Sequence, residues 1–289
     1  MLHVLPCLDD EFRADRHRTN LDIPQRIAAE LGRSAVEAIR VGSYQGPAGP
    51  VDWRAEVERT VSLRQSIRPD AALPPAPGRR FPRTEVQVTN ETTLEAGRRL
   101  VDRGFRPLAL NFANGISPGG GFLHGARAQE EALCRSSALY ATLVDDPMYA
   151  AHYFRPLPDS TDWCLISREV PVFRDDAGNP LPRPWLLDFL TCAAPYAPAV
   201  GSDASARVLR ARIGRVLAVA HVYGWTSLVL GAWGCGAFRN DPTTTARDFR
   251  DALEGPFDGC FETVVFAITD WSPGRSFLGP FREIGRAHV

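Results

Sequence analysis

The most informative absence in this sequence is lysine, because all 33 basic residues are arginine. A chain without lysine cannot form a Schiff base with a carbonyl substrate, and it cannot contain the P-loop lysine that binds nucleotide phosphates. The basic residues are balanced by 34 acidic ones, and the formal net charge is -1. This balance gives no basic footprint for nucleic acid, so we expect no DNA partner.

Paired cysteines and long apolar runs are absent as well. The six cysteines include no CxxC pair and have no histidine cluster near them, so we expect reduced thiols and no metal site. No apolar run reaches the roughly 18 residues of a membrane span, and the N-terminus turns acidic too early for a signal peptide. We therefore expect a soluble, cytoplasmic monomer without a membrane partner.

The first 83 residues are predicted to form a helical accessory region. Residues 23–42 place Ile, Leu, Val and Ala mostly three or four positions apart, which is typical of an amphipathic helix. The proline-rich residues 68–83 disfavour regular structure and indicate a linker. We therefore divide the chain into residues 1–83, the accessory region with its linker, and residues 84–289, a second domain.

Strand and helix patterns alternate in the second domain. Strands are predicted at residues 84–90, 107–114, 227–233 and 261–271, and helices at residues 91–104, 128–144, 204–224 and 242–255. Such alternation predicts an α/β fold whose sheet is flanked by helices on both faces. Ligands of open α/β sheets bind beyond the carboxyl ends of the strands, so the loops after these strands are the place to look for a site.

Two glycine-rich loops follow two of these strands and lead into helices. The first is residues 115–128, with three successive glycines, and the second is residues 234–242. Glycine lets backbone N–H groups approach an anion closely, and a helix N-terminus adds partial positive charge. Each loop alone is equally consistent with an ordinary tight turn, and neither fits a standard nucleotide-binding motif. Together, the two loops could hold a diphosphate.

The triplet Gln129, Glu130, Glu131 stands seven residues after the glycines and opens the next predicted helix. Glutamates in a first helical turn often only complement the helix dipole. Adjacent helical positions point roughly 100° apart, so these two carboxyls cannot flank one bond as a standard glycosidase pair does. We expect one carboxyl to transfer protons and the other to position the substrate, with burial raising the pKa of the acid.

The combination of GGG, seven residues and QEE resembles the signature of poly(ADP-ribose) glycohydrolases. The surrounding NFANGISPGGGFLHGARAQEEALCRSSALY is similar to the bacterial-type branch of that family. So are VQVTNETTLEAGRRL, PVFRDDAGNP, LVLGAWGCGAFRNDP and VVFAITDWSP, in the same order. The resemblance implies a macrodomain-like mixed sheet with helices on both faces and an N-terminal helical accessory region.

The resemblance also implies a role for each motif residue. Glu131 would be the catalytic acid and Glu130 would hydrogen-bond ribose hydroxyls. The residues expected to bind the ligand are Asn114, Gly119, Gly120, Gly121, Gln129, Gly234, Cys235, Gly236, Ala237 and Phe238. Asn114 would contact the terminal ribose, and Phe238 would pack on ribose with a flat apolar ring. No metal and no cofactor is implied.

The implied activity is hydrolysis of the ribose-ribose O-glycosidic bond of poly(ADP-ribose), from chain ends, with ADP-ribose as the product. The partner would be the polymer or an ADP-ribosylated protein. Two alternatives stay open at this point. One is a macrodomain reader that binds ADP-ribose without cleaving it, although a reader has no use for an intact QEE. The other is a hydrolase of mono-ADP-ribosyl protein, O-acetyl-ADP-ribose or free NAD.

Overall fold

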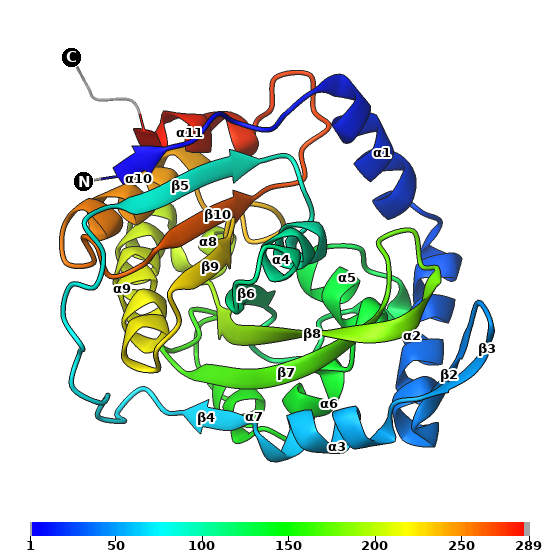
Figure 1. Ribbon diagram of the computed structural model, residues 1–289. Helices are drawn as coiled ribbons and strands as arrows, with labels where there is room; N and C mark the ends of the chain where they lie inside the picture. The colour runs from blue at the N-terminus through cyan, green and yellow to red at the C-terminus, as the bar shows by residue number, and fades with distance from the viewer. Residues whose placement is uncertain (1, 286–289) are drawn as a thin grey trace.

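The computed structural model describes residues 2–285, and its centre is one eight-stranded mixed sheet. The strands are β1 (Leu2–Val4), β4 (Gln65–Ile67), β5 (Thr84–Thr89), β6 (Pro107–Ala113), β7 (Cys164–Arg174), β8 (Pro180–Ala193), β9 (Ser227–Leu230) and β10 (Thr263–Ala267). Their order is β1-β5-β10-β9-β6-β8-β7-β4 (Figure 1). Neighbouring strands are parallel from β1 to β8, whereas β7 runs antiparallel to both β8 and β4.

Helices cover both faces of the sheet, as the sequence predicts (Figure 1). One face is covered by α9 (Ser202–Val222), α10 (Pro242–Glu254) and α11 (Leu278–Arg282). The other face is covered by α2 (Gln25–Val41), α3 (Arg54–Ser62), α4 (Thr93–Asp102), α5 (Gln129–Ser136), α6 (Leu139–Leu143) and α7 (Pro147–Tyr153). The remaining helical elements are α1 (Glu11–Leu21), α8 (Ala197–Val200) and two 3-10 turns, Phe122–His124 and Glu283–Gly285.

The central strand β6 is apolar at every position except Asn111. Leu108 and Leu110 pack toward the α9 face, while Ala109 packs toward the α4 and α5 face. Successive side chains of a strand point to opposite faces, so a strand covered on both sides is apolar at nearly every position. This double cover fixes the carboxyl end of β6 in the interior of the molecule, where the first glycine loop begins.

The predicted helix at residues 128–144 is wrong in its extent, because the chain breaks at Ser137 into α5 and α6. Ser137 has an extended backbone with φ -146° and ψ 175°, and it bridges to Val172 of β7. Its hydroxyl donates to the carbonyl of Leu133 and accepts from the N–H of Leu139. A serine hydroxyl that bonds nearby backbone groups competes with helical pairing. The long hairpin of β7 and β8 is not predicted from the sequence at all.

The N-terminal region is less purely helical than predicted. The helix expected at residues 23–42 is confirmed as α2, and residues 68–83 hold neither helix nor strand. However, β1 pairs with β5 and β4 pairs with β7, so both belong to the main sheet, and β2 (Ser43–Gly46) and β3 (Gly49–Asp52) form a separate hairpin. The division of the chain at residue 83 stays a prediction.

Candidate active site

A cavity of about 400 Å³ opens at the carboxyl ends of the central strands. Across the sheet, the segments after four strands contribute to its wall in the order of those strands. The segment after β6 leads to the acidic pair on α5, and the segment after β9 is the second glycine loop. Ala267 at the end of β10 and Ile268, Thr269 and Trp271 just after it form the third segment, and residues 91–94, which follow β5, form the fourth. The sequence therefore places the site at the correct edge of the sheet.

Glu130 lies in this wall with only 3% of its surface exposed, and both of its carboxyl oxygens accept hydrogen bonds. Asn111 Nδ2 donates to one oxygen at 3.2 Å, and the backbone N–H of Asn114 donates to the other at 2.7 Å. Burial raises the pKa of Glu130 to about 8, against the lowering effect of the Asn114 hydrogen bond, and the neighbouring Glu131 charge raises it further. Burial therefore favours the protonated form of Glu130.

Glu131 is bound by the protein on one side only. Its Oε1 accepts from the N–H of Gly121 at 3.0 Å. Its Oε2 is buried and has no hydrogen-bond partner among residues 2–285, and the residue itself lines the cavity. A buried carboxyl oxygen without a partner is rare and is a common mark of a catalytic or ligand-binding group.

Gly120 is the position where the glycine loop requires glycine. Its φ is +59°, and a Cβ there would lie 2.2 Å from Oε1 of Glu131 and 3.1 Å from Oε2 of Glu130. Any larger residue would therefore displace the two carboxyls. The glycines Gly119, Gly120 and Gly121 shape the acidic pair in this structure, but they do not themselves line the cavity.

The second glycine loop is held by a buried asparagine that the sequence reasoning missed. Asn240 Nδ2 donates to the carbonyls of Pro195 and Gly234 at 2.9 and 3.1 Å, and its Oδ1 accepts from Ser205 at 2.6 Å. Gly234 has φ +76° and would place a Cβ 2.8 Å from the Asn240 amide. The loop therefore has one defined conformation.

Four residues of the second glycine loop line the cavity, namely Gly234, Gly236, Ala237 and Phe238. Among the described residues, the N–H groups of the last three find no hydrogen-bond acceptor, whereas the N–H of Cys235 already donates to Ala232. Cys235 points away from the cavity, and burial raises the pKa of its thiol to about 12. Phe238 packs edge-on against Tyr196, with ring centroids 5.8 Å apart.

Asn114 and Gln129 both line the cavity, but their side chains also bond the protein. Asn114 Oδ1 accepts from the N–H groups of Ile116 and Ser117, which forms the turn into the glycine loop. The Gln129 side-chain amide accepts from the N–H of Phe112 and donates to the carbonyl of Leu110, both in β6. It also donates to Thr93 Oγ1 at 3.0 Å. Gln129 therefore ties α5 to the sheet, and its ligand-binding role stays a prediction.

Three further ionisable residues near the cavity were not predicted. Glu91 lines the wall and is held by Arg99, whose Nε and Nη2 bond its two oxygens at 3.1 and 2.7 Å. Asp176 also lines the wall, and burial raises its pKa to about 7 although Thr92 donates to it at 2.6 Å. The guanidinium of Arg135 is buried, its Nη1 and Nη2 have no partner in the described part of the chain, and it lies within electrostatic range of Asp176 and Glu131. A polar residue at a strand end, as Glu91 is, could have been found from the sequence.

Within residues 2–285, no group of three or more His, Cys, Asp or Glu side chains could hold a metal ion. In the same part of the chain, no helix is both long and apolar enough to cross a bilayer. All six cysteines are free, and only Cys7 is exposed.

Comparison with known proteins agrees with this geometry. The family described as microbial-type PARG, catalytic domain, matches residues 32–175. The crystal structure of poly(ADP-ribose) glycohydrolase from Thermomonospora curvata has a TM-score of 0.82 and 40% sequence identity, covering 90% of this chain and 99% of that one. Bound to the inhibitor ADP-HPD, the same enzyme has a TM-score of 0.81 at 40% identity, covering 89% of this chain and 99% of that one.

A more distant fold match is the glycohydrolase from Deinococcus radiodurans in complex with ADP-ribose, with a TM-score of 0.72 and 40% identity over 79% of this chain and 96% of that one. A search of curated proteins gave no match. The chain therefore belongs to the poly(ADP-ribose) glycohydrolases. Within them, it is a member of the microbial-type family.

Proposed function

We propose that this protein hydrolyses the O-glycosidic bond between the riboses of poly(ADP-ribose) and releases ADP-ribose, with Glu131 as the general acid and base. The observation that carries this assignment is that Glu131 lines the cavity and that its buried Oε2 has no hydrogen-bond partner among the described residues. A general acid must reach the leaving oxygen within hydrogen-bond distance. Glu131 has an oxygen free for this contact, whereas both oxygens of Glu130 already accept from Asn111 and Asn114.

Glu130 takes the second role, which is to position the substrate. Its raised pKa supports a protonated Glu130 at neutral pH, so the two adjacent carboxyls need not both be charged in the closed site. A protonated Glu130 can donate its proton in a hydrogen bond to a ribose hydroxyl while its two oxygens keep the hydrogen bonds from Asn111 and Asn114. The proposed mechanism also requires Glu131 to be protonated when the substrate binds, because a general acid must hold the proton that it transfers.

The diphosphate of the substrate fits the second loop. The N–H groups of Gly236, Ala237 and Phe238 have no acceptor in the described chain, and free backbone N–H groups are the usual ligands of phosphate oxygens. The ring of Phe238 lies beside them and offers an apolar surface to a ribose. The terminal ribose then lies between this loop and Asn114, next to Glu131.

The reaction follows from these positions. Glu131 donates its proton to the 2′-oxygen of the neighbouring unit as the bond from C1″ to that oxygen breaks, through a transition state with positive charge on the ribose. The resulting Glu131 carboxylate takes a proton from the water that attacks C1″, which restores the acid. The products are ADP-ribose and a polymer with a free 2′-hydroxyl. The nearby diphosphate favours the positive charge on the ribose, so the proposal needs no metal.

Cleavage is proposed to occur at chain ends. Leu21 of α1 contributes to the cavity wall, and Arg127 binds Asp22 at 2.7 Å, so the N-terminal region reaches the site. A wall of this kind would leave no exit for polymer beyond the terminal unit. We also propose that residues 84–289 carry the catalytic function, and that the enzyme works as a cytoplasmic monomer without DNA or membrane partners.

The test is incubation of wild type, Glu131→Gln and Glu37→Gln with poly(ADP-ribosyl)ated protein in the presence of a chelator, with free ADP-ribose followed by chromatography. Glu37 is an exposed residue paired with Arg40, so its variant is the matched control. Wild type and the control should release ADP-ribose, while Glu131→Gln should bind ADP-ribose by calorimetry but lose at least about 1000-fold in turnover. Retained turnover in Glu131→Gln removes Glu131 from its role.

The same digestion separates the alternatives. A reader would bind ADP-ribose while wild type releases nothing from any substrate. A hydrolase of smaller substrates would release ADP-ribose from mono-ADP-ribosyl protein, or consume O-acetyl-ADP-ribose, and leave the polymer intact. Early release of free oligomers from the polymer would contradict the chain-end proposal but not the glycohydrolase activity.

A further inference from the structure

The loop between β10 and α11, residues 269–277, supplies two aromatic rings to the cavity. Trp271 and Phe277 both line it, and they are 38% and 37% exposed, so their rings are not covered by the protein. The strand β10 is two strands away from β6, where the acidic pair is attached. Neighbouring strands are about 4.8 Å apart, so these rings lie on the order of 10 Å from the reacting end of the cavity.

This loop has almost no apolar anchor of its own. Between Asp270 and Leu278, the only buried residue is Arg275. The loop is therefore held in place by polar contacts rather than by a hydrophobic core. A segment with few buried apolar contacts has low local stability unless other interactions fix it.

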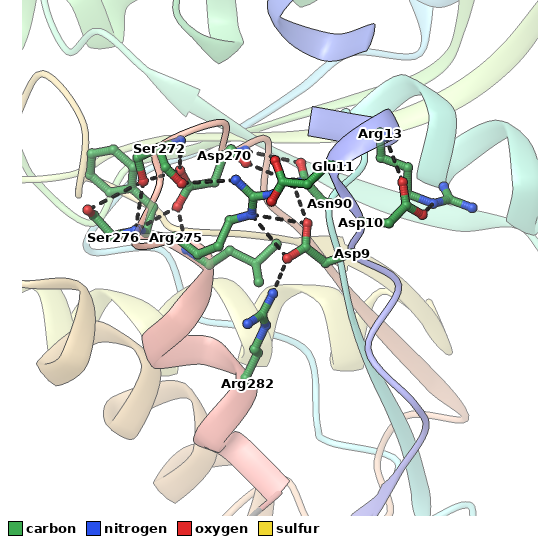
Figure 2. Close-up of polar contacts among 12 residues, drawn as sticks. Asp9, Asp10, Glu11, Arg13, Asn90, Asp270, Ser272, Arg275, Ser276 and Arg282 are labelled. Atoms are coloured by element: carbon green, nitrogen blue, oxygen red, sulfur yellow. Dashed lines mark hydrogen bonds and ion pairs between the residues drawn. The ribbon is translucent and has the colours of Figure 1, made fainter. Parts of the chain in front are cut away.

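Asp270 provides the first set of these contacts (Figure 2). Its Oδ1 accepts from the N–H and the hydroxyl of Ser272 at 2.9 and 2.7 Å, and its Oδ2 accepts from the N–H groups of Phe277 and Leu278 at 2.8 and 3.1 Å. Its backbone exchanges two hydrogen bonds with the side chain of Asn90. Asp270 therefore fixes both ends of the loop to one carboxylate.

Arg275 provides the second set, and it reaches across to the N-terminal segment (Figure 2). Its Nε donates to both carboxyl oxygens of Asp9 at 3.2 and 3.1 Å, and its Nη2 donates to Glu11 at 2.9 Å. Its Nη1 donates to the carbonyl of Ser272 at 2.9 Å, inside the loop. Arg275 has φ +49°, so the chain adopts an unfavourable conformation in order to make these contacts.

Asp9 is the centre of the network. It lies outside any helix or strand, between β1 and α1, and its side chain is 6% exposed. Besides Arg275, it accepts from Asn90 Nδ2 at 2.8 Å and pairs with Arg282 of α11. Buried ion pairs contribute little net stability compared with apolar packing, but they can specify one conformation. The cluster is therefore better suited to fixing the position of the loop than to stabilising the fold.

We propose that Asp9, Arg275 and Asp270 are positioning residues for the nucleobase end of ADP-ribose. Through them, the N-terminal segment holds residues 269–277 so that Trp271 and Phe277 form the aromatic wall against which the adenine packs. The inference rests on the proposed function, because ADP-ribose held at its terminal ribose by Glu131 must extend its adenosine toward this wall. The network acts on ligand affinity, while the acidic pair acts on bond cleavage.

The test compares Asp9→Asn, Arg275→Ala and Arg275→Lys with wild type and the control Glu37→Gln, by steady-state kinetics and by calorimetry with ADP-ribose. Asp9→Asn and Arg275→Ala should raise KM and the Kd for ADP-ribose about tenfold, while kcat changes less than about threefold, because a charge-assisted contact remote from the reacting bond is lost. Arg275→Lys should recover part of the affinity, and Glu37→Gln should match wild type.

A double-mutant cycle separates positioning from a general structural effect. In a background carrying Trp271→Ala and Phe277→Ala, Asp9→Asn should change the Kd less than about twofold, because the wall that it positions is gone. The proposal is overturned if Asp9→Asn raises the Kd by the same factor with and without the two aromatic rings. It is also overturned if Asp9→Asn lowers kcat at an unchanged KM. Urea unfolding checks that each variant folds. If Asp9→Asn does not fold, the fallback variant is Ser272→Ala, which removes one donor to Asp270 and should raise the Kd for ADP-ribose about threefold.

Failure of the two proposals can be told apart. The Kd measurements need no turnover. A wild type that binds ADP-ribose but cleaves no substrate therefore contradicts the proposed function, and the double-mutant cycle still tests the positioning role of Asp9, Arg275 and Asp270. A wild type that cleaves polymer, with a Kd that Asp9→Asn leaves unchanged, contradicts the network alone.

Discussion

Glu130 is buried with a raised pKa, and its replacement by glutamine gives a test of that environment that does not depend on any activity. Glutamine resembles the protonated carboxyl in shape, and its Oε1 can accept from the N–H of Asn114 as Glu130 does. Its Nε2 can donate to Asn111 Oδ1, which is buried without a partner in the described chain, once the Asn111 amide rotates. The substitution therefore removes the charge and keeps the hydrogen bond from Asn114, while the rotated Asn111 amide gives up its hydrogen bond to Thr191 Oγ1.

The magnitude follows from the pKa of the folded state. The ordinary value is 4.5 and burial raises the pKa of Glu130 to about 8. A raised pKa in the folded protein means that its contribution to stability is complete below pH 4.5 and is lost as the pH rises through about 8. An interval of about 3.5 pH units corresponds to at most about 5 kcal/mol, of which about 3 kcal/mol falls between pH 5 and pH 8.

The assay is urea unfolding of wild type and Glu130→Gln at pH 5 and pH 8. Ionisable groups shared by both proteins largely cancel in the difference, so the variant should gain about 3 kcal/mol relative to wild type on going from pH 5 to pH 8. The control Glu37→Gln should show no such gain, because the hydrogen bond from Arg40 lowers the pKa of Glu37 and it is ionised at both pH values. An equal difference at the two pH values would refute the reasoning.

Two further predictions concern the loops. Gly120→Ala should abolish turnover and lower the free energy of unfolding by about 2 to 4 kcal/mol, because its Cβ would lie 2.2 Å from Glu131 Oε1. The control is Gly104→Ala, at a glycine with a similarly positive φ but no atom within 4 Å of the added Cβ. This control should lower the free energy of unfolding in urea by only about 1 to 2 kcal/mol and keep full turnover. Asn240→Ala removes the three hydrogen bonds that this side chain makes in the second loop. It should lower the free energy of unfolding by about 2 to 4 kcal/mol and weaken ADP-ribose binding about tenfold. Unchanged affinity by calorimetry would show that the loop keeps its shape without this side chain.

The sequence predicts much of the α/β core because the relevant signals are local. The strands at residues 84–90 and 107–114 and the helix at residues 204–224 depend on runs and periods that a short window contains, and the structure confirms them as β5, β6 and α9. The acidic pair and the second glycine loop follow strand ends, so their place at one edge of the sheet also follows from the topology.

Other features depend on contacts between distant parts of the chain and could not be predicted. Asp176 reaches the cavity only because the β7 and β8 hairpin carries it to Thr92, which is 84 positions away in the sequence. Arg275 and Asp9 are 266 positions apart, and neither belongs to a motif. Charged residues outside helices and strands look like solvated surface in a sequence, and only the fold shows that Arg275 and Asp9 are buried together.

The spacing between the glycines and the glutamates can itself be explained by hydrogen bonding. The N–H of Gly121 bonds Glu131 across ten residues, and the N–H of Asn114 bonds Glu130 across sixteen, so the loop must fold back onto the first turn of α5. Both carboxyls lie at that helix N-terminus, where the dipole and these N–H groups offset the cost of burying them. An insertion between the two motifs would separate each carboxyl from its donor. The combined motif is more specific than either half because each half holds the other in place.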